Sequence, residues 1–236
     1  GDECQQNDER LIKLCSLRFL SSHMIELSTL LTFVPAALVI IISPGPDTLY
    51  VLTQSIKSGH LAGLSAGLGT ASGVLVHTAA AVFGLAALLK TSALLYTIIK
   101  YLGVLYLFFL GVQMLRNDDE FNMDVDALDD DDDSVMESYK KAVVVNISNP
   151  KVAVFVLAFF PQFIPSQANV TLQMILLGVL YAILSLSYLS GVTLFAAHIR
   201  RKLLESPLTR RAVRYASGSV LLGFGAKLAF EKRPLP

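Results

Sequence analysis

Long apolar stretches separated by short polar segments dominate the sequence. Residues 58–89 contain no Asp, Glu, Lys or Arg, and neither do residues 152–199. A membrane-spanning helix needs about 20 mostly apolar residues, so the first stretch holds one span and the second is long enough for two. The whole pattern predicts six spans, at residues 27–55, 61–89, 92–115, 142–161, 170–199 and 212–230.

Composition agrees with a membrane protein and excludes several other classes. Hydrophobic types make up 53% of the 236 residues and charged types 16%, against about 25% charged in soluble domains. The formal net charge is zero, so nothing indicates a nucleic-acid partner. Cys4 and Cys15 both precede the first span and cannot form a zinc site by themselves. We expect no metal, no cofactor and no enzymatic activity, because no Ser/His/Asp or Cys/His constellation emerges.

Charge divides the chain into parts. Residues 118–133 carry ten acidic side chains, so residues 116–141 are expected to form a solvated loop. This loop separates a first three-helix unit, residues 24–115, from a second, residues 142–236. Residues 1–23 form a separate N-terminal tail.

The distribution of Lys and Arg predicts the orientation. The loops after spans one, three and five carry ten Lys and Arg residues, whereas the opposite side has seven, or four without the N-terminal tail. The positive-inside rule places the richer side, including the acidic loop, in the cytoplasm. Both termini are therefore expected outside.

A helix-breaking motif lies inside span one and another inside span four. The motifs are Ser43-Pro44-Gly45-Pro46-Asp47 and Asn146-Ile147-Ser148-Asn149-Pro150-Lys151. Proline removes a backbone donor and interrupts a helix, and three spans per unit would make the second unit an inverted copy of the first. The predicted fold is an all-α polytopic membrane protein with two inverted three-helix repeats, in which helices one and four are broken. Paired breaks of this kind indicate a transporter's binding site at the membrane midplane.

An ionisable residue accompanies each break. A charge at the centre of a spanning helix costs about 2.5–3.5 kcal/mol, so we expect Asp47 and Lys151 to face a common cavity and compensate each other, directly or through substrate. The alternative for each is a side chain that extends to the interface near a span end. Freed carbonyls and helix N-termini together suit a zwitterion such as an amino acid. The predicted substrate-binding residues are Ser43, Pro44, Gly45, Pro46, Asp47, Asn146, Asn149, Pro150 and Lys151.

Span two combines small residues with a histidine. Gly63, Gly67, Gly69 and Gly73 would let neighbouring helices approach closely. His77 follows Gly73 by one helical turn. It could relay protons, or it could be a neutral, hydrogen-bonded packing residue.

These motifs together resemble the LysE/RhtB family of amino-acid exporters. The resemblance rests on residues 44–47, 59–64, Gly73 with His77, 146–151 and 159–164, and it extends over residues 24–230. Met24 matches the usual start of the family, and the long acidic run departs from the family's usual loop. The resemblance implies an exporter of homoserine, threonine, leucine or lysine in the cytoplasmic (inner) membrane. It also implies a proton-driven homodimer, for which Asp47 and His77 are the proton-coupling candidates.

Two other classes of membrane protein have related architectures. A metal-cation exporter, the alternative prediction, would need His, Cys and Asp ligands within the spans, and the sequence has few of them there. A carrier of reducing equivalents would need a cysteine in each repeat. Neither break contains one, which excludes that class.

Overall fold

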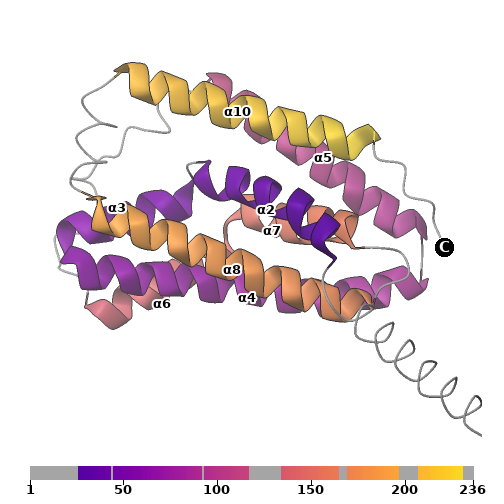
Figure 1. Ribbon diagram of the computed structural model, residues 1–236, viewed down its shortest axis with the longest axis horizontal. Helices are drawn as coiled ribbons and strands as arrows, with labels where there is room; N and C mark the ends of the chain where they lie inside the picture. Colours follow the sequence, from indigo (N-terminus) through magenta and orange to yellow (C-terminus); the bar gives the residue numbers. More distant parts are fainter. Residues whose placement is uncertain are drawn as a thin grey trace, which may run out of the picture.

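The computed structural model describes residues 26–43, 45–91, 93–116, 134–164, 169–196 and 207–230. Within these residues every regular element is a helix (Figure 1), as expected for an all-α protein. The tail at residues 1–23, the acidic run 118–133 and Pro44 lie outside the described residues, so the predictions made for them stay predictions.

The first predicted break is confirmed. Residues 27–57 form two helices, α2 (Leu27–Ile42) and α3 (Pro46–Lys57), which are bent by 56° relative to each other. Helix α3 begins at Pro46, with Gly45 as its N-cap. Proline is well tolerated at this first position because its missing N–H would have no partner within the helix.

The second break has the same construction. Helix α6 (Val135–Ile147) ends before Asn149, and α7 (Pro150–Val154) begins at a proline. A π-helical turn, η3 (Phe155–Phe159), and a 3-10 turn, η4 (Phe160–Phe163), continue the chain. The two parts of this pair are bent by 54°. Both breaks therefore start their second half with a proline.

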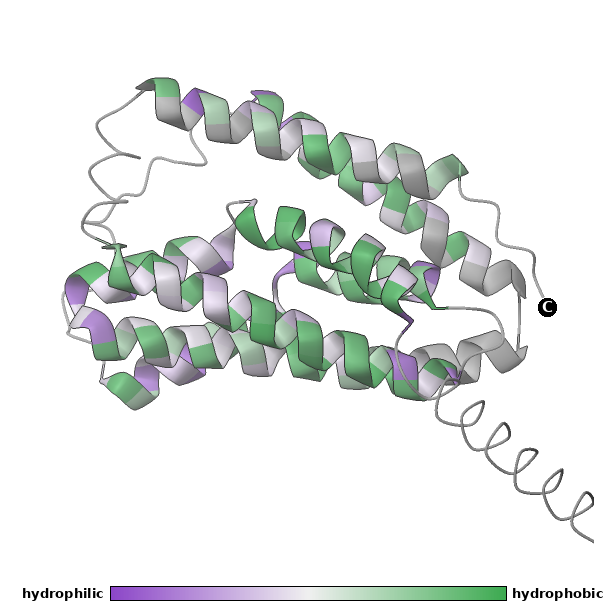
Figure 2. Cartoon of the chain, in the orientation of Figure 1, coloured by the Kyte–Doolittle hydropathy of each residue, from purple (hydrophilic) through white to green (hydrophobic). Residues whose placement is uncertain are grey.

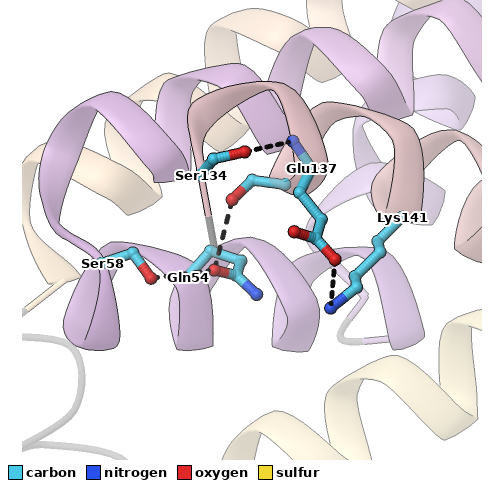
Figure 3. A network of polar contacts seen from close by, with 6 residues as sticks. Gln54, Ser58, Ser134, Glu137 and Lys141 are labelled. Carbon is cyan, nitrogen blue, oxygen red and sulfur yellow. Dashed lines mark hydrogen bonds and ion pairs between the residues drawn. The ribbon is translucent and has the colours of Figure 1, made fainter. Parts of the chain in front are cut away.

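Helix α6 begins earlier than the sequence pattern indicated. We expected span four to start at residue 142, but residues 135–141 of the expected loop are helical. Ser134 caps the helix by accepting a hydrogen bond from the Glu137 N–H at 3.2 Å, which is the Ser-x-x-Glu start of a capping box. Glu137 also pairs with Lys141 at 3.3 Å. A polar capping turn thus replaces the apolar start that the hydropathy pattern suggested (Figure 3).

Four further helices complete the described structure. They are α4 (Gly59–Thr91), α5 (Ala93–Arg116), α8 (Val170–Leu194) and α10 (Pro207–Phe230). In the described part of the chain, segments Gly59–Gly84 and Val170–Leu194 are long and apolar enough to cross a membrane, and counting each bent pair as one span gives up to four. Helices α5 and α10 correspond to the predicted spans three and six, but among the described residues neither is long and apolar enough to be counted. Helix α5 contributes only the shorter apolar segment Tyr101–Gln113. Six spans and an inverted repeat therefore stay predictions.

The helices are arranged around the two bent pairs (Figure 1). Helices α5 and α10 pack along each other on one side, and α4 packs against α6, α8 and α3 on the other. Helices α2 and α7 lie between these two groups. Apolar residues predominate along the helices (Figure 2), and many large ones are exposed on the surface of the protein. Leu61 and Phe83, for example, are 72% and 78% exposed, as a surface in contact with lipid requires.

Glycines of α4 allow its neighbours to approach closely. A Cβ atom on Gly73 would lie 2.5 Å from the side-chain oxygen of Asn146, and one on Gly69 would collide with the α6 backbone. Gly63 has the same relation to side chains of α3 and α8. The predicted packing role is confirmed at these three positions, whereas a Cβ on Gly67 would make ordinary contacts at 3.6 Å.

Replacing Gly73 by alanine should destabilise the protein. The new methyl group overlaps Asn146, and overpacking of this kind costs about 1–3 kcal/mol. For a chain of this size, the Tm of the detergent-solubilised protein should fall by about 2–12 °C. Gly84→Ala is the matched control, since no atom of the described residues lies within 4 Å of its Cβ position. Equal Tm values for the two variants would contradict the packing role of Gly73.

Candidate functional site

The two helix breaks meet at a buried carboxylate. Asp47 lies in the first turn of α3, where the positive end of the helix dipole favours a negative charge. Its Oδ2 atom accepts hydrogen bonds from Asn146 Nδ2 at 3.1 Å and from Asn149 Nδ2 at 2.7 Å. Residues from the second break therefore hold the charged residue of the first.

A buried lysine makes the reciprocal connection. Lys151 Nζ donates a hydrogen bond to the Ser43 carbonyl oxygen at 2.7 Å, across the gap between α2 and α3. A Cβ atom on Gly45 would lie only 2.8 Å from this nitrogen, so the glycine makes room for the ammonium. A lysine in the first turn of a helix is unfavourable because the helix dipole places positive potential there. The contact with the Ser43 carbonyl compensates for this unfavourable position.

His77 satisfies the backbone at the second break. In an uninterrupted helix the Asn146 carbonyl would accept from the N–H of residue 150, but Pro150 has none. The carbonyl instead lies 3.1 Å from His77 Nε2 and 2.9 Å from the Asn149 N–H. Because a carbonyl only accepts, Nε2 carries the hydrogen. This is the hydrogen-bonded histidine of our two alternatives, and a role in proton relay stays a prediction.

Two cavities of different size adjoin the breaks. The smaller has a volume of about 10 Å³, which is room for about one water molecule, and Asp47, Thr48, Tyr181 and Ser185 are among its lining residues. The larger has a volume of about 250 Å³ and is lined by residues of both breaks together with α5 and α10. Lys151 lines both cavities, whereas Asp47 lines the smaller one.

Two oxygen atoms in the site accept no hydrogen bond from the part of the chain that the structure describes. Among the described residues, Asp47 Oδ1 and Asn146 Oδ1 are buried without a partner. Buried polar atoms are nearly always paired, so such exceptions call for an explanation. An unpaired carboxylate oxygen beside a cavity for one water molecule can accept a proton, which gives the site a means of acid–base chemistry.

Most of the predicted site residues come together. Those around the breaks are Ser43, Gly45, Pro46, Asp47, Asn146, Asn149, Pro150 and Lys151, while Pro44 lies outside the described residues. Asp47 and Lys151 are only 8% and 9% exposed. Both are enclosed by other helices, so the alternative in which they extend to an interface is wrong. That these residues bind substrate stays a prediction.

Sequence reasoning missed the contributions of α5 and α8. Tyr106 and Gln113 of α5 line the larger cavity, and the polar residues Tyr181, Ser185 and Tyr188 of α8 line the smaller one together with Leu189. Both sets follow helical spacing. Polar side chains that recur at intervals of three, four or seven within an apolar span would have pointed to these faces.

Neutralising the two buried charges together should be less harmful than removing the lysine alone. Lys151→Met leaves the Asp47 carboxylate without its buried counter-charge, and breaking such a pair costs about 3–5 kcal/mol. In Asp47→Asn with Lys151→Met no unpaired charge remains. Thermal denaturation of the wild type, both single variants and the double variant in detergent should give a coupling energy of about 0.5–3 kcal/mol. Strictly additive effects would show that the two charges do not compensate each other.

Comparison with known proteins identifies the family. The model of the LysE type translocator family matches residues 38–232. An uncharacterised membrane protein of Pseudomonas aeruginosa is 35% identical over 206 residues, covering 84% of this chain and 93% of that protein. No solved structure matches the chain.

Two similar proteins carry names that state a transport activity. The leucine efflux protein of Enterobacter sp. is 32% identical over 203 residues, covering 84% of this chain and 93% of that protein. The homoserine/homoserine lactone efflux protein of Salmonella typhimurium is 31% identical over 188 residues, covering 80% and 89%. The chain therefore belongs to the LysE family of translocators and is a multi-pass membrane transport protein.

Proposed function

We propose that this protein exports amino acids across the cytoplasmic membrane and couples their efflux to proton entry. The observation that carries the proposal is that two buried ionisable residues, Asp47 and Lys151, lie at the meeting point of two broken helices and line one small cavity. Charges inside membrane proteins are costly and mark transport pathways. The names of the leucine and homoserine efflux relatives support amino acids as the substrate class.

Lys151 is the proposed contact for the substrate carboxylate. Its side chain lines the larger cavity, and the N-terminus of α3 adds positive potential near the same break. Backbone carbonyls at the breaks and the side-chain oxygen of Asn149 offer acceptors for the substrate ammonium. The cavity thus presents both kinds of partner that a zwitterion needs.

Asp47 is the proposed proton-binding residue. Its Oδ1 atom has no hydrogen-bond partner among the described residues, and Asp47 is one of the residues that line the cavity with room for one water molecule. The ammonium group of a bound zwitterion favours the ionised form of this carboxylate, whereas a proton on Asp47 removes the charge that attracts the ammonium. Substrate and proton would then bind in alternation, as the exchange of one for the other requires.

The proposed architecture is two inverted repeats with six spans and both termini outside. The pairing of the half-helices supports an antiparallel relation of the two bent pairs. Thr29, near the start of α2, donates a hydrogen bond to the Phe163 carbonyl at the end of η4 at 3.3 Å. At the other end of the two pairs, α3 packs against α6. A homodimer is proposed on the resemblance to the family alone.

The alternative of a metal-cation exporter has no observation in its favour. Such a site would need a cluster of His, Cys, Asp or Glu ligands. In the part of the chain that the structure describes, no three of these residues come together as a candidate metal site.

Cells that produce the protein should release specific amino acids when loaded with a mixture of dipeptides. We expect one or two amino acids to accumulate in the medium, measured by mass spectrometry, and Lys151→Ala to abolish the release because the carboxylate contact is lost. Lys141→Ala is the matched control, since Lys141 is an exposed lysine of α6 that pairs with Glu137. Membrane levels of each variant are measured alongside. No release by wild-type protein that is inserted in the membrane would refute the proposal.

Asp47→Asn should separate substrate movement from proton coupling. Asparagine keeps the size of aspartate and can still accept from Asn149, but it cannot exchange a proton. In proteoliposomes, substrate exchange should persist. The rate of efflux with an imposed proton gradient should fall to the rate measured without a gradient. Glu137→Gln, which neutralises an exposed carboxylate, should keep the stimulation. Full gradient-driven export by Asp47→Asn would show that another group couples the proton.

A further inference from the structure

The larger cavity has a wall that the helix breaks do not provide. Tyr106, Phe109, Leu110 and Gln113 of α5 all line it. Their spacing of three, four and seven residues places them on one face of the helix. Residues of both breaks, among them Ser43, Asn149 and Lys151, line the same cavity. A ligand held at Lys151 in this cavity would therefore have α5 residues among its neighbours.

The described side chains that line the larger cavity carry positive charge but no negative charge. Among the described residues that line the cavity, Lys151 is the charged one, and no carboxylate is present. The nearby Asp47 lines the smaller cavity and is held by Asn146 and Asn149. A second cation in the larger cavity would face the lysine ammonium without a counter-charge, and in a site of low dielectric such repulsion is costly.

The α5 wall is mixed in polarity. Phe109 and Leu110 are apolar, whereas Tyr106 and Gln113 carry a hydroxyl and an amide. A carboxamide both donates and accepts hydrogen bonds, so Gln113 can contact a hydroxyl group on a ligand. The volume of about 250 Å³ is below the about 300–1,000 Å³ that is usual for pockets of drug-sized ligands. Size and polarity fit a small, uncharged side chain.

We propose that the larger cavity selects amino acids with uncharged side chains and rejects lysine and arginine, and that Gln113 is a specificity-determining residue. The inference rests on the proposed amino-acid export. The substrate carboxylate meets Lys151, and its side chain lies against the face of α5 that contains Tyr106, Phe109 and Gln113. Rejection of cationic side chains follows from the missing carboxylate in this wall, because specificity depends on unfavourable contacts with the wrong ligand as much as on favourable ones with the right one.

Introducing a carboxylate at position 113 tests the proposal. Efflux of leucine, homoserine, threonine and lysine is measured in proteoliposomes that contain the full chain and are loaded with equal concentrations of the four. Wild-type protein should export one or more neutral amino acids and little lysine. Gln113→Glu should raise the ratio of lysine efflux to neutral efflux at least about tenfold, the gain expected from a charge-assisted hydrogen bond.

Gln113→Leu is the matched control, because it removes the amide without adding a charge. It should leave lysine excluded and shift the preference from homoserine and threonine toward leucine. Tyr106 lies on the same face of α5 and provides a second variant. Tyr106→Phe should shift the preference in the same direction by a smaller amount, and it replaces the test if the variants at position 113 fail to insert. Each result is expressed as a ratio of rates, so a general loss of activity does not change it.

The possible failures are distinguishable. If wild-type protein exports no amino acid, the proposed function fails. If it exports lysine as well as neutral amino acids, or if Gln113→Glu and Tyr106→Phe both leave the efflux ratios unchanged while export continues, export stands and the assignment of this cavity and of Gln113 is refuted.

Discussion

Two backbone carbonyl groups without a helical partner govern how the centre of this molecule is built. Pro150 removes the donor that the Asn146 carbonyl would have used, and the Ser43 carbonyl lies in the gap between α2 and α3. Within a bilayer such groups must find partners in the protein. His77 of α4 donates a hydrogen bond to the Asn146 carbonyl, and Lys151 of α7 donates one to the Ser43 carbonyl. Once an ammonium is buried for this purpose it needs a compensating charge, and Asp47 lies at the same junction. The polar centre is thus a consequence of the breaks.

Close approach of backbone and side chain at two glycines makes this centre possible. Gly45 lets the Lys151 ammonium reach the Ser43 carbonyl, and Gly73 lets the Asn146 side chain lie against α4. From there Asn146 reaches the Asp47 carboxylate. The glycines carry no charge themselves, but they determine whether the polar and charged groups can meet. The same absence of side chains brings α4 close to α3 and α8 at Gly63, so packing and polar contacts depend on one property of this helix.

The sequence predicted those features that have a strong local cause. Proline next to glycine or asparagine within an apolar run indicated both breaks, and the cost of buried charge placed Asp47 and Lys151 together. The start of α6 was missed because Ser134 and Glu137 begin a helix through capping, which hydropathy does not register. The role of α5 was missed because Gln113 belongs to the site only through the packing of distant segments. Contacts between segments that are far apart in the sequence follow from the assembled fold. In the sequence they are marked only by a weak helical spacing of polar residues.

Lys151 has one further consequence, since it forms part of the wall of both cavities. Any anion that binds the ammonium from the larger cavity changes the electrostatic potential at Asp47, and so changes its affinity for a proton. Thermodynamic reciprocity then requires that protonation change the affinity for the anion by the same factor. The two occupants would thus be linked through one side chain that lines both cavities, and no chain of intermediate residues would be needed to connect two separate sites.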